Sequence, residues 1–169
     1  MTRRVVITGP ESSGKSTLAQ ALARQLSTVV VPEFARTYLQ YLHRPYTIDD
    51  LAVIHRGQLS WEAWYAQRAQ KWLICDTDWT VMQIWKEHFA PQSDLHFERQ
   101  PWHHAFLCRP DIPWEPDPLR EHPHPHQREA LFDEYLQLLD STGWPFTIVS
   151  GEELAQRLQK VLPVLQNNS

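Results

Sequence analysis

Hydrophobic positions follow two spacings that alternate along the chain. Short apolar runs ended by Pro, Gly or Asp are typical of buried strands, and they occur at residues 5–8, 28–31, 72–76, 105–108 and 146–149. Between them, apolar residues recur at helical spacing in residues 15–26, 49–70, 79–88, 127–139 and 152–165. Residues 49–70 can form one helix or two. Strands that alternate with helices predict an α/β fold with a five-stranded parallel sheet flanked by helices.

Composition narrows the class of protein. A chain of 169 residues, 42% hydrophobic and 21% charged, predicts a single folded domain over residues 1–169. The formal net charge of -4 provides no overall attraction for nucleic acid or an anionic membrane. Because neither a signal peptide nor a run of about 18 apolar residues is present, we expect a soluble cytoplasmic protein. Cys75 and Cys108 lie within apolar runs, which indicates buried thiols.

The clearest motif follows the first predicted strand and opens the first predicted helix. Its spacing is that of the Walker A phosphate loop, and its members are Gly9, Pro10, Glu11, Ser12, Ser13, Gly14, Lys15 and Ser16, with Thr17 next. A tight loop of small residues presents backbone N–H groups to a triphosphate at the positive end of a helix. Lys15 would reach the β- and γ-phosphates, and the Ser16 hydroxyl would ligate Mg²⁺. The motif therefore predicts binding of ATP with Mg²⁺.

Acidic residues follow the third predicted strand. Asp76 stands at its carboxyl end, where α/β sheets place their ligands, and its carboxylate could hold Mg²⁺. Asp78 has two interpretations: it faces the acceptor substrate, or it caps the helix over residues 79–88.

A second pair of charged residues, Glu33 and Arg36, follows the second predicted strand. Glu33 could accept the proton of an acceptor hydroxyl, and Arg36 could offset developing phosphate charge. The alternative is a solvated Glu–Arg pair at the start of a helix. The proton acceptor stays open between Glu33 and Asp76.

Residues 109–128 are rich in proline and charge, and we interpret them as a lid. Arg120 could swing over the γ-phosphate, where it would stabilise charge and exclude water. Arg128 would add a second cation for ATP. Taken singly, each arginine is more often a surface residue, but both come after the fourth strand and near the start of a helix.

Together these motifs resemble one family, the ribosylnicotinamide kinase domain of NadR-type proteins in bacterial NAD metabolism. The matching segments are residues 8–16 (TGPESSGKS), 33–36 (EFAR), 75–78 (CDTD) and 110–115 (PDIPWE), followed by Asp117, Leu119, Arg120 and Arg128. In this order they cover nearly the whole chain.

The resemblance implies a P-loop kinase fold and ATP-dependent phosphorylation of the 5′-hydroxyl of nicotinamide riboside, giving nicotinamide mononucleotide. It implies Trp64 as the aromatic side chain against the cationic nicotinamide ring, where stacking and cation–π attraction add. Trp61, Trp79 and Trp114 are its rivals, and Trp114 joins Glu33, Arg36 and Asp78 in the expected substrate site. The adenylyltransferase and DNA-binding modules often fused upstream are absent from this sequence, so we expect a stand-alone kinase.

Two other functions remain open. The same residues would serve a kinase for another nucleoside or small hydroxyl compound. A non-catalytic ATP-binding regulator would instead use the lid to report ATP or a nicotinamide metabolite to a partner. The preference for ATP over GTP and the oligomeric state are not indicated by any motif.

Overall fold

The computed structural model describes residues 2–117, 122 and 124–167. Its centre is a sheet of five parallel strands in the order β2-β3-β1-β4-β5. The strands are β1 (Arg3–Thr8), β2 (Val29–Val31), β3 (Trp72–Asp76), β4 (His104–Cys108) and β5 (Phe146–Val149). All five were predicted from the sequence within one or two residues, and the parallel sheet is confirmed.

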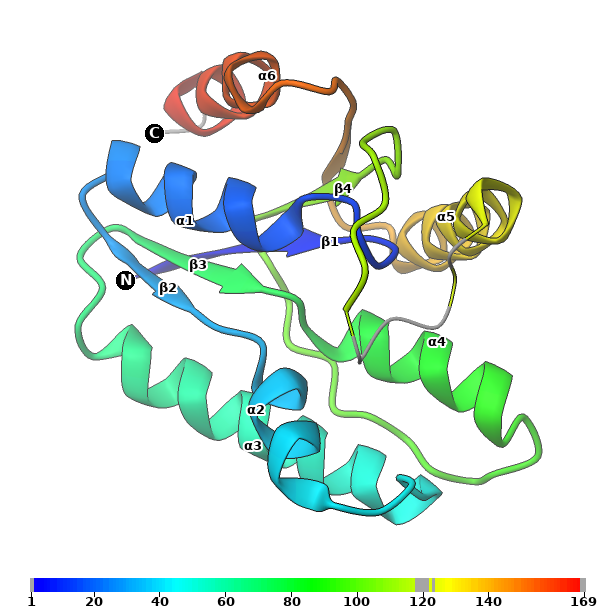
Figure 1. The fold of residues 1–169 in the computed structure, drawn as a ribbon. Coiled ribbons are helices and arrows are strands. Elements are labelled where there is room, and N and C mark those ends of the chain that lie inside the picture. The colour runs from blue at the N-terminus through cyan, green and yellow to red at the C-terminus, as the bar shows by residue number, and fades with distance from the viewer. Residues whose placement is uncertain (1, 118–121, 123, 168–169) are drawn as a thin grey trace.

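Six helices connect and flank the strands (Figure 1). They are α1 (Lys15–Gln25), α2 (Phe34–Leu42), α3 (Ile48–Ala66), α4 (Trp79–Phe89), α5 (Pro125–Thr142) and α6 (Leu154–Asn167). Residues 49–70 thus contribute one helix rather than two. Helix α2 was expected only in the alternative interpretation of Glu33 and Arg36, because it is short and its apolar side chains are mostly exposed or half-buried. The last residues of the expected lid, 125–128, belong to α5.

Each face of the sheet is covered by its own helices, α1 and α6 on one side and α3, α4 and α5 on the other. Strand residues alternate between the two sides: Val5 and Ile7 pack under α1, whereas Val6 faces the opposite layer. Because both faces are buried, the strands read as nearly continuous apolar runs, as parallel sheets do. The same arrangement leaves one edge, at the carboxyl ends of the strands, for function.

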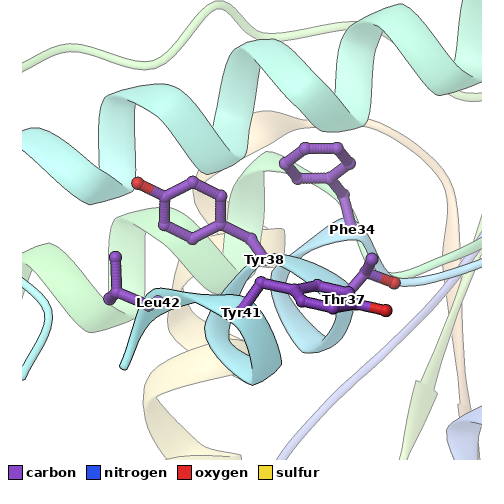
Figure 2. A pocket seen from close by; sticks show the side chains of 5 residues that line it. All are labelled: Phe34, Thr37, Tyr38, Tyr41 and Leu42. Atoms are coloured by element: carbon purple, nitrogen blue, oxygen red, sulfur yellow. The ribbon is translucent and has the colours of Figure 1, made fainter. Parts of the chain in front are cut away.

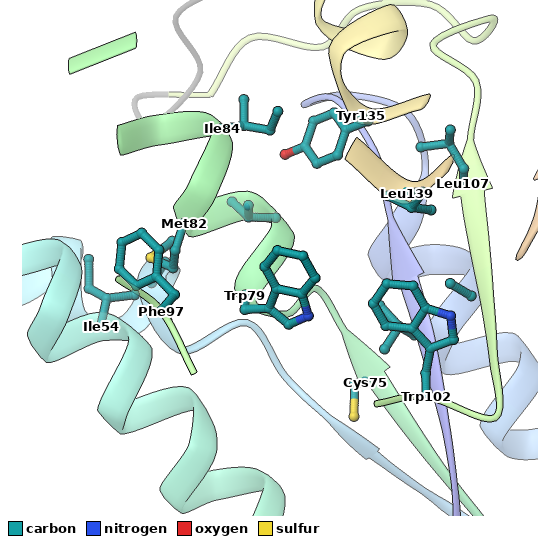
Figure 3. Close-up of a cluster of buried hydrophobic side chains, with 14 of the residues drawn as sticks. Ile54, Cys75, Trp79, Met82, Ile84, Phe97, Trp102, Leu107, Tyr135 and Leu139 are labelled. Carbon is teal, nitrogen blue, oxygen red and sulfur yellow. The ribbon is translucent and has the colours of Figure 1, made fainter. Parts of the chain in front are cut away.

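Tryptophans fill much of the layer beneath the sheet (Figure 3). Trp79 is 2% exposed and stacks on Trp102 with ring centroids 6.2 Å apart, and Trp144 meets Trp102 edge-on at 4.8 Å. The Trp102 indole donates to the Pro145 carbonyl at 2.9 Å. Trp79 is therefore a core residue and was a wrong candidate for the ligand ring.

The two cysteines lie in the core on opposite sides of the sheet, Cys75 with the tryptophans and Cys108 in the layer of α1 and α6. Cys75 and Cys108 are buried free thiols, as predicted, and burial raises the pKa of the Cys108 thiol to about 11. Among the helices described, none combines the length and the apolar character needed to cross a membrane.

Candidate active site

The phosphate loop joins β1 to α1 through glycines that the backbone requires. Gly9 has a φ of 133°, and a Cβ there would come within 2.6 Å of the Cys108 carbonyl oxygen. Gly14 precedes α1 with a φ of 77°, a conformation that costs other residues free energy. The loop therefore turns tightly at the amino end of α1, where unpaired N–H groups and the helix dipole attract anions.

Lys15 lies across this loop. Its ammonium donates to the Pro10 carbonyl at 2.6 Å, and the Ser13 hydroxyl donates to the same oxygen at 2.7 Å. Burial raises the pKa of the Glu33 and Asp76 carboxyls, and the charge of Lys15 opposes that rise in both. Three of the residues predicted to take part in the reaction are thus close enough to interact.

Asp76 ends β3 and is 5% exposed. Burial raises the pKa of its carboxyl, while a hydrogen bond from Ser16 and the charge of Lys15 oppose that rise. Within the described part of the chain, the buried Oδ1 of Asp76 has no hydrogen-bond partner. A buried carboxylate oxygen beside a hydroxyl suits a hard cation, so Asp76 and Ser16 fit the Mg²⁺ that was predicted for them.

Glu33 stands at the N-cap position of α2. Burial raises the pKa of its carboxyl; Lys15 and Arg36 lower it, and the charges of Asp76 and Asp117 raise it further. A half-buried carboxyl with an elevated pKa is suited to accept a proton. Glu33, Arg36 and Asp76 therefore belong to one electrostatic cluster at the carboxyl edge of the sheet.

The start of α2 is held by residues that the sequence did not indicate. The Phe34 N–H donates to the side-chain carbonyl of Gln58 on α3 at 2.9 Å. A Cβ at Gly57 would lie 2.2 Å from the Phe34 ring, so the ring packs directly on the α3 backbone. Gln58 and Gly57 thereby fix the turn that carries Glu33.

Asp78 is the cap of α4. Its Oδ1 accepts hydrogen bonds from the Thr80 N–H at 3.0 Å and the Thr80 hydroxyl at 2.6 Å. Its Oδ2 lies 3.6 Å from an Arg4 nitrogen, and the side chain has no exposed surface. The capping interpretation is confirmed. The buried Oδ2 of Asp78 has no hydrogen-bond partner among the described residues, and the predicted contact of Asp78 with substrate stays a prediction.

The position of Trp64 does not support its predicted contact with the nicotinamide ring. It lies in the last turn of α3, and only five residues separate the end of α3 from the start of β3, whereas Asp76 is at the opposite end of that strand (Figure 1). The Trp64 ring is 49% exposed and packs under the Arg68 guanidinium at 3.3 Å. Because α3 runs back along the sheet, Trp64 is carried away from the phosphate loop.

Two of its rivals lie closer to the site. Trp61, one turn earlier on α3, meets the Phe34 ring edge-on with centroids 4.9 Å apart. Trp114 belongs to the lid, and its indole N–H is buried with no partner among the described residues. Either ring could stack against an acceptor that is bound beside Glu33.

The start of α2 also borders a shallow apolar groove (Figure 2). The side chains that line it are Phe34, Thr37, Tyr38, Tyr41 and Leu42. Tyr38 is fixed in place by its hydroxyl, which donates to Asp50 at 2.6 Å, while Tyr41 is 75% exposed. The groove follows one face of α2, and none of the residues that line it belongs to the phosphate loop.

The lid contacts both sides of the site. The Glu115 N–H donates to the Ser12 hydroxyl at 3.3 Å, and His122 hydrogen-bonds to the Glu11 carboxylate through its backbone N–H. At the acceptor side, Asp117 pairs with Arg36 at 2.8 Å. The described residues of the predicted lid thus contact the phosphate loop on one side and α2 on the other. Arg120, its expected phosphate ligand, lies outside the described residues.

Arg128 reaches the site from α5. It is 4% exposed, and its Nη1 lies 3.5 Å from the carbonyl oxygens of Ser12 and Ile112. Arg128 therefore contacts the backbone of the phosphate loop and the lid; its predicted contact with ATP stays a prediction.

The fold and this site define a class of protein. The strand order β2-β3-β1-β4-β5, the phosphate loop after β1 and the acid at the end of β3 are those of P-loop kinases. A family model described as an AAA domain, AAA_28, matches residues 4–157, and the chain belongs to this family.

Relatives support the resemblance to NadR-type proteins. The chain is 25% identical to the trifunctional NAD biosynthesis/regulator protein NadR of Escherichia coli (strain K12), over 97% of this chain and 42% of that protein. It therefore spans less than half the length of this relative.

Solved structures share the fold. Crystal structures of NadR in complex with NR, and with NAD and AMP-PNP, have TM-scores of 0.70 and 0.71 at 20% identity, covering 89% and 98% of this chain and 46% and 49% of theirs. A thymidylate kinase from Ehrlichia chaffeensis has a TM-score of 0.68 at 14% identity, over 98% of this chain and 99% of that one.

Proposed function

We propose that the protein transfers the γ-phosphate of ATP to the 5′-hydroxyl of nicotinamide riboside, giving nicotinamide mononucleotide for NAD biosynthesis. The observation that carries this proposal is the cluster of Lys15, Glu33 and Asp76 at one edge of the sheet. In this cluster Lys15 would bind phosphate, Glu33 would accept the proton and Asp76 would ligate the metal. The similarity to NadR supports the choice of acceptor.

The chemistry follows from the positions of these groups. The backbone of the phosphate loop and Lys15 bind the β- and γ-phosphates. The acceptor oxygen forms a bond to the γ-phosphorus as the bond to the leaving ADP oxygen breaks, and the hydroxyl proton passes to Glu33. Asp76 and Ser16 would hold Mg²⁺, which would neutralise phosphate charge.

The lid completes the site. The ion pair of Arg36 and Asp117 holds it against α2, and Arg120 and Arg128 would supply positive charge for ATP. With the lid closed, water is excluded and ATP is protected from hydrolysis. The acceptor ring lies against Trp61 or Trp114, where a cationic ring gains stacking and cation–π attraction.

A second candidate is a kinase for another nucleoside. It is favoured by the similarity of the fold to a deoxyadenosine kinase from M. mycoides, with a TM-score of 0.56 at 12% identity over nearly the whole length of both chains. The phosphate loop, Glu33 and the lid would serve either acceptor equally, so the rings beside Glu33 decide between the two.

The test is a panel of nucleosides, including nicotinamide riboside, thymidine and deoxyadenosine, incubated with the protein, ATP and Mg²⁺. We expect ADP and a phosphorylated product in equal amounts with nicotinamide riboside, and far less with the others. Turnover of a deoxynucleoside without turnover of nicotinamide riboside would establish the second candidate instead. Binding of ATP with no turnover of any acceptor would indicate a regulator.

A further inference from the structure

Arg157 is a charged residue at a position where an apolar one is expected. It lies on α6 one and two turns before Val161 and Leu165, which pack into the core against α1, and it is itself 3% exposed. A cation so deeply buried is costly unless its charge and its N–H groups are paired. Its partners therefore indicate why an arginine stands here.

The guanidinium joins three segments of the chain. Its Nη1 donates to the Ser13 carbonyl in the phosphate loop. Its Nη2 donates to the Arg109 carbonyl at 3.1 Å and to Asp111 Oδ1 at 2.5 Å, both at the start of the lid. Its Nε donates to the Gly151 carbonyl at 2.7 Å, in the turn between β5 and α6.

Asp111 balances this charge. One carboxylate oxygen receives the Arg157 hydrogen bond, and the other accepts from the Gly151 N–H at 2.7 Å. The pair therefore forms a neutral unit that ties the start of the lid to the turn after β5. With its charge taken up by Asp111, Arg157 acts on the backbone of the phosphate loop.

The contact with Ser13 determines how the loop presents its N–H groups. In a trans peptide the carbonyl and the following N–H point in opposite directions, so the carbonyl held by Arg157 directs the Gly14 N–H to the other side. Arg128 approaches the preceding carbonyl, that of Ser12, at 3.5 Å. The guanidinium of Arg157 also packs on the loop, since a Cβ at Gly14 would lie 3.2 Å from its Nη1.

We propose that Arg157, whose charge is balanced by Asp111, is a positioning residue. From α6 it holds the backbone of the phosphate loop in the orientation that binds ATP. This inference rests on the ATP binding in the proposed function and not on the identity of the acceptor. It extends the site to α6, a helix that carries none of the residues assigned to substrates. It also links the start of the lid to the phosphate loop through one side chain.

The experiment compares Arg157→Met, Arg157→Lys and Asp111→Asn with the wild type. Gln159→Ala, an exposed position on the same helix, is the control. Equilibrium binding of the non-hydrolysable analogue AMP-PNP gives the Kd, and steady-state kinetics give KM and kcat for both substrates. A thermal melt without nucleotide checks that each variant is folded.

We expect Arg157→Met to raise the Kd for AMP-PNP and the KM for ATP about tenfold or more, as the loss of charge-assisted hydrogen bonds predicts. The KM for the acceptor should stay within about twofold. Arg157→Lys should give an intermediate Kd, because one ammonium replaces a fork of donors. The control should match the wild type.

Other outcomes would overturn the proposal. A folded Arg157→Met protein that binds AMP-PNP as the wild type does would show that the residue merely fills the core. A lower kcat with an unchanged KM for ATP, as a smaller folded fraction produces, would lead to the same conclusion. If Arg157→Met does not fold, Asp111→Asn decides: we expect a Kd raised about threefold, and a wild-type Kd would contradict the proposal. Because AMP-PNP binding needs no acceptor, the result stands apart from any failure to phosphorylate nicotinamide riboside.

Discussion

Arg36 on α2 and Asp117 in the lid form an ion pair of 2.8 Å across the acceptor side of the site. The two residues are 81 positions apart in the chain, and their side chains are 43% and 20% exposed. An ion pair with this exposure contributes little to folding, on the order of 0.2–1 kcal/mol. Its position indicates instead that it holds the lid against α2, the helix that follows Glu33. We call this ion pair the latch.

The latch predicts that Asp117→Asn uncouples ATP use from transfer. With the lid held less firmly, water enters the site, so we expect more ADP than phosphorylated acceptor and a KM for the acceptor several-fold higher. The melting temperature should hardly change. Parallel assays of ADP and product measure the ratio, with Asp94→Asn, outside the lid, as the control. A ratio that stays at one would show that the pair does not govern closure.

Glu33→Gln is predicted to lower kcat/KM by about 10²- to 10⁴-fold, the range of general-base catalysis. Burial raises the pKa of the Glu33 carboxyl, and only the ionised form accepts a proton. The activity of the wild type should therefore fall, as the pH is lowered, at a pH above the ordinary pKa of glutamate, about 4.3. The pH profile of kcat/KM measures this limb, and the residual activity of Glu33→Gln should lack it.

Asp76→Asn provides the matched comparison, because the pKa of that carboxyl is also raised by burial. As the predicted Mg²⁺ ligand, Asp76 should determine the Mg²⁺ concentration needed for half-maximal activity. We expect that concentration to rise in Asp76→Asn but not in Glu33→Gln. If Asp76→Asn alone removed the acidic limb, the roles of the two carboxylates would be exchanged.

Gly57→Ala tests the packing that supports Glu33. An alanine in the middle of a helix normally stabilises by about 1 kcal/mol relative to glycine. Here its Cβ would lie 2.2 Å from the Phe34 ring, and such overpacking costs about 1–3 kcal/mol. We therefore expect a loss of stability in urea denaturation and a lower kcat, since the turn with Glu33 must shift.

A second substitution identifies the cause. Phe34→Leu in the Gly57→Ala background removes the ring that the new methyl group would meet, and it should restore part of both the stability and the kcat. A Gly57→Ala protein more stable than the wild type would mean that helix propensity outweighs the contact.

Local sequence patterns were sufficient to predict the strands, most of the helices and the phosphate loop. Runs of apolar residues, their spacing and the glycines of residues 9–16 act over a few positions, so the strands and most helices were predicted within a few residues. The sequence also placed Glu33 and Asp76 correctly at strand ends, because the carboxyl ends of parallel strands share one edge.

The roles of the other residues depend on contacts with residues that are distant in the chain. The capping role of Asp78 depends on its contacts with Thr80 and Arg4, and Trp64 could not be placed without the direction of α3. Arg4 and Arg157 were missed because charged residues are expected at the surface. Arg157 is buried and Arg4 is half-buried, and each is paired there with a carboxylate distant in sequence, Asp111 for Arg157 and Glu62 for Arg4.

The aromatic contact with the acceptor gives the last prediction. Trp64→Ala should leave the KM for the acceptor unchanged, because the ring lies at the far end of α3 and packs under Arg68. Trp114→Phe keeps an aromatic ring in the lid but removes the pyrrole part of the indole with its N–H, which is buried without a partner among the described residues. If that N–H donates to the acceptor, its loss should raise the KM about 2- to 12-fold, as expected for a neutral hydrogen bond worth about 0.5–1.5 kcal/mol. Steady-state kinetics with saturating ATP distinguish the two variants. A raised KM in Trp64→Ala would contradict the geometry, and unchanged values in both would leave Trp61 as the ring that faces the acceptor.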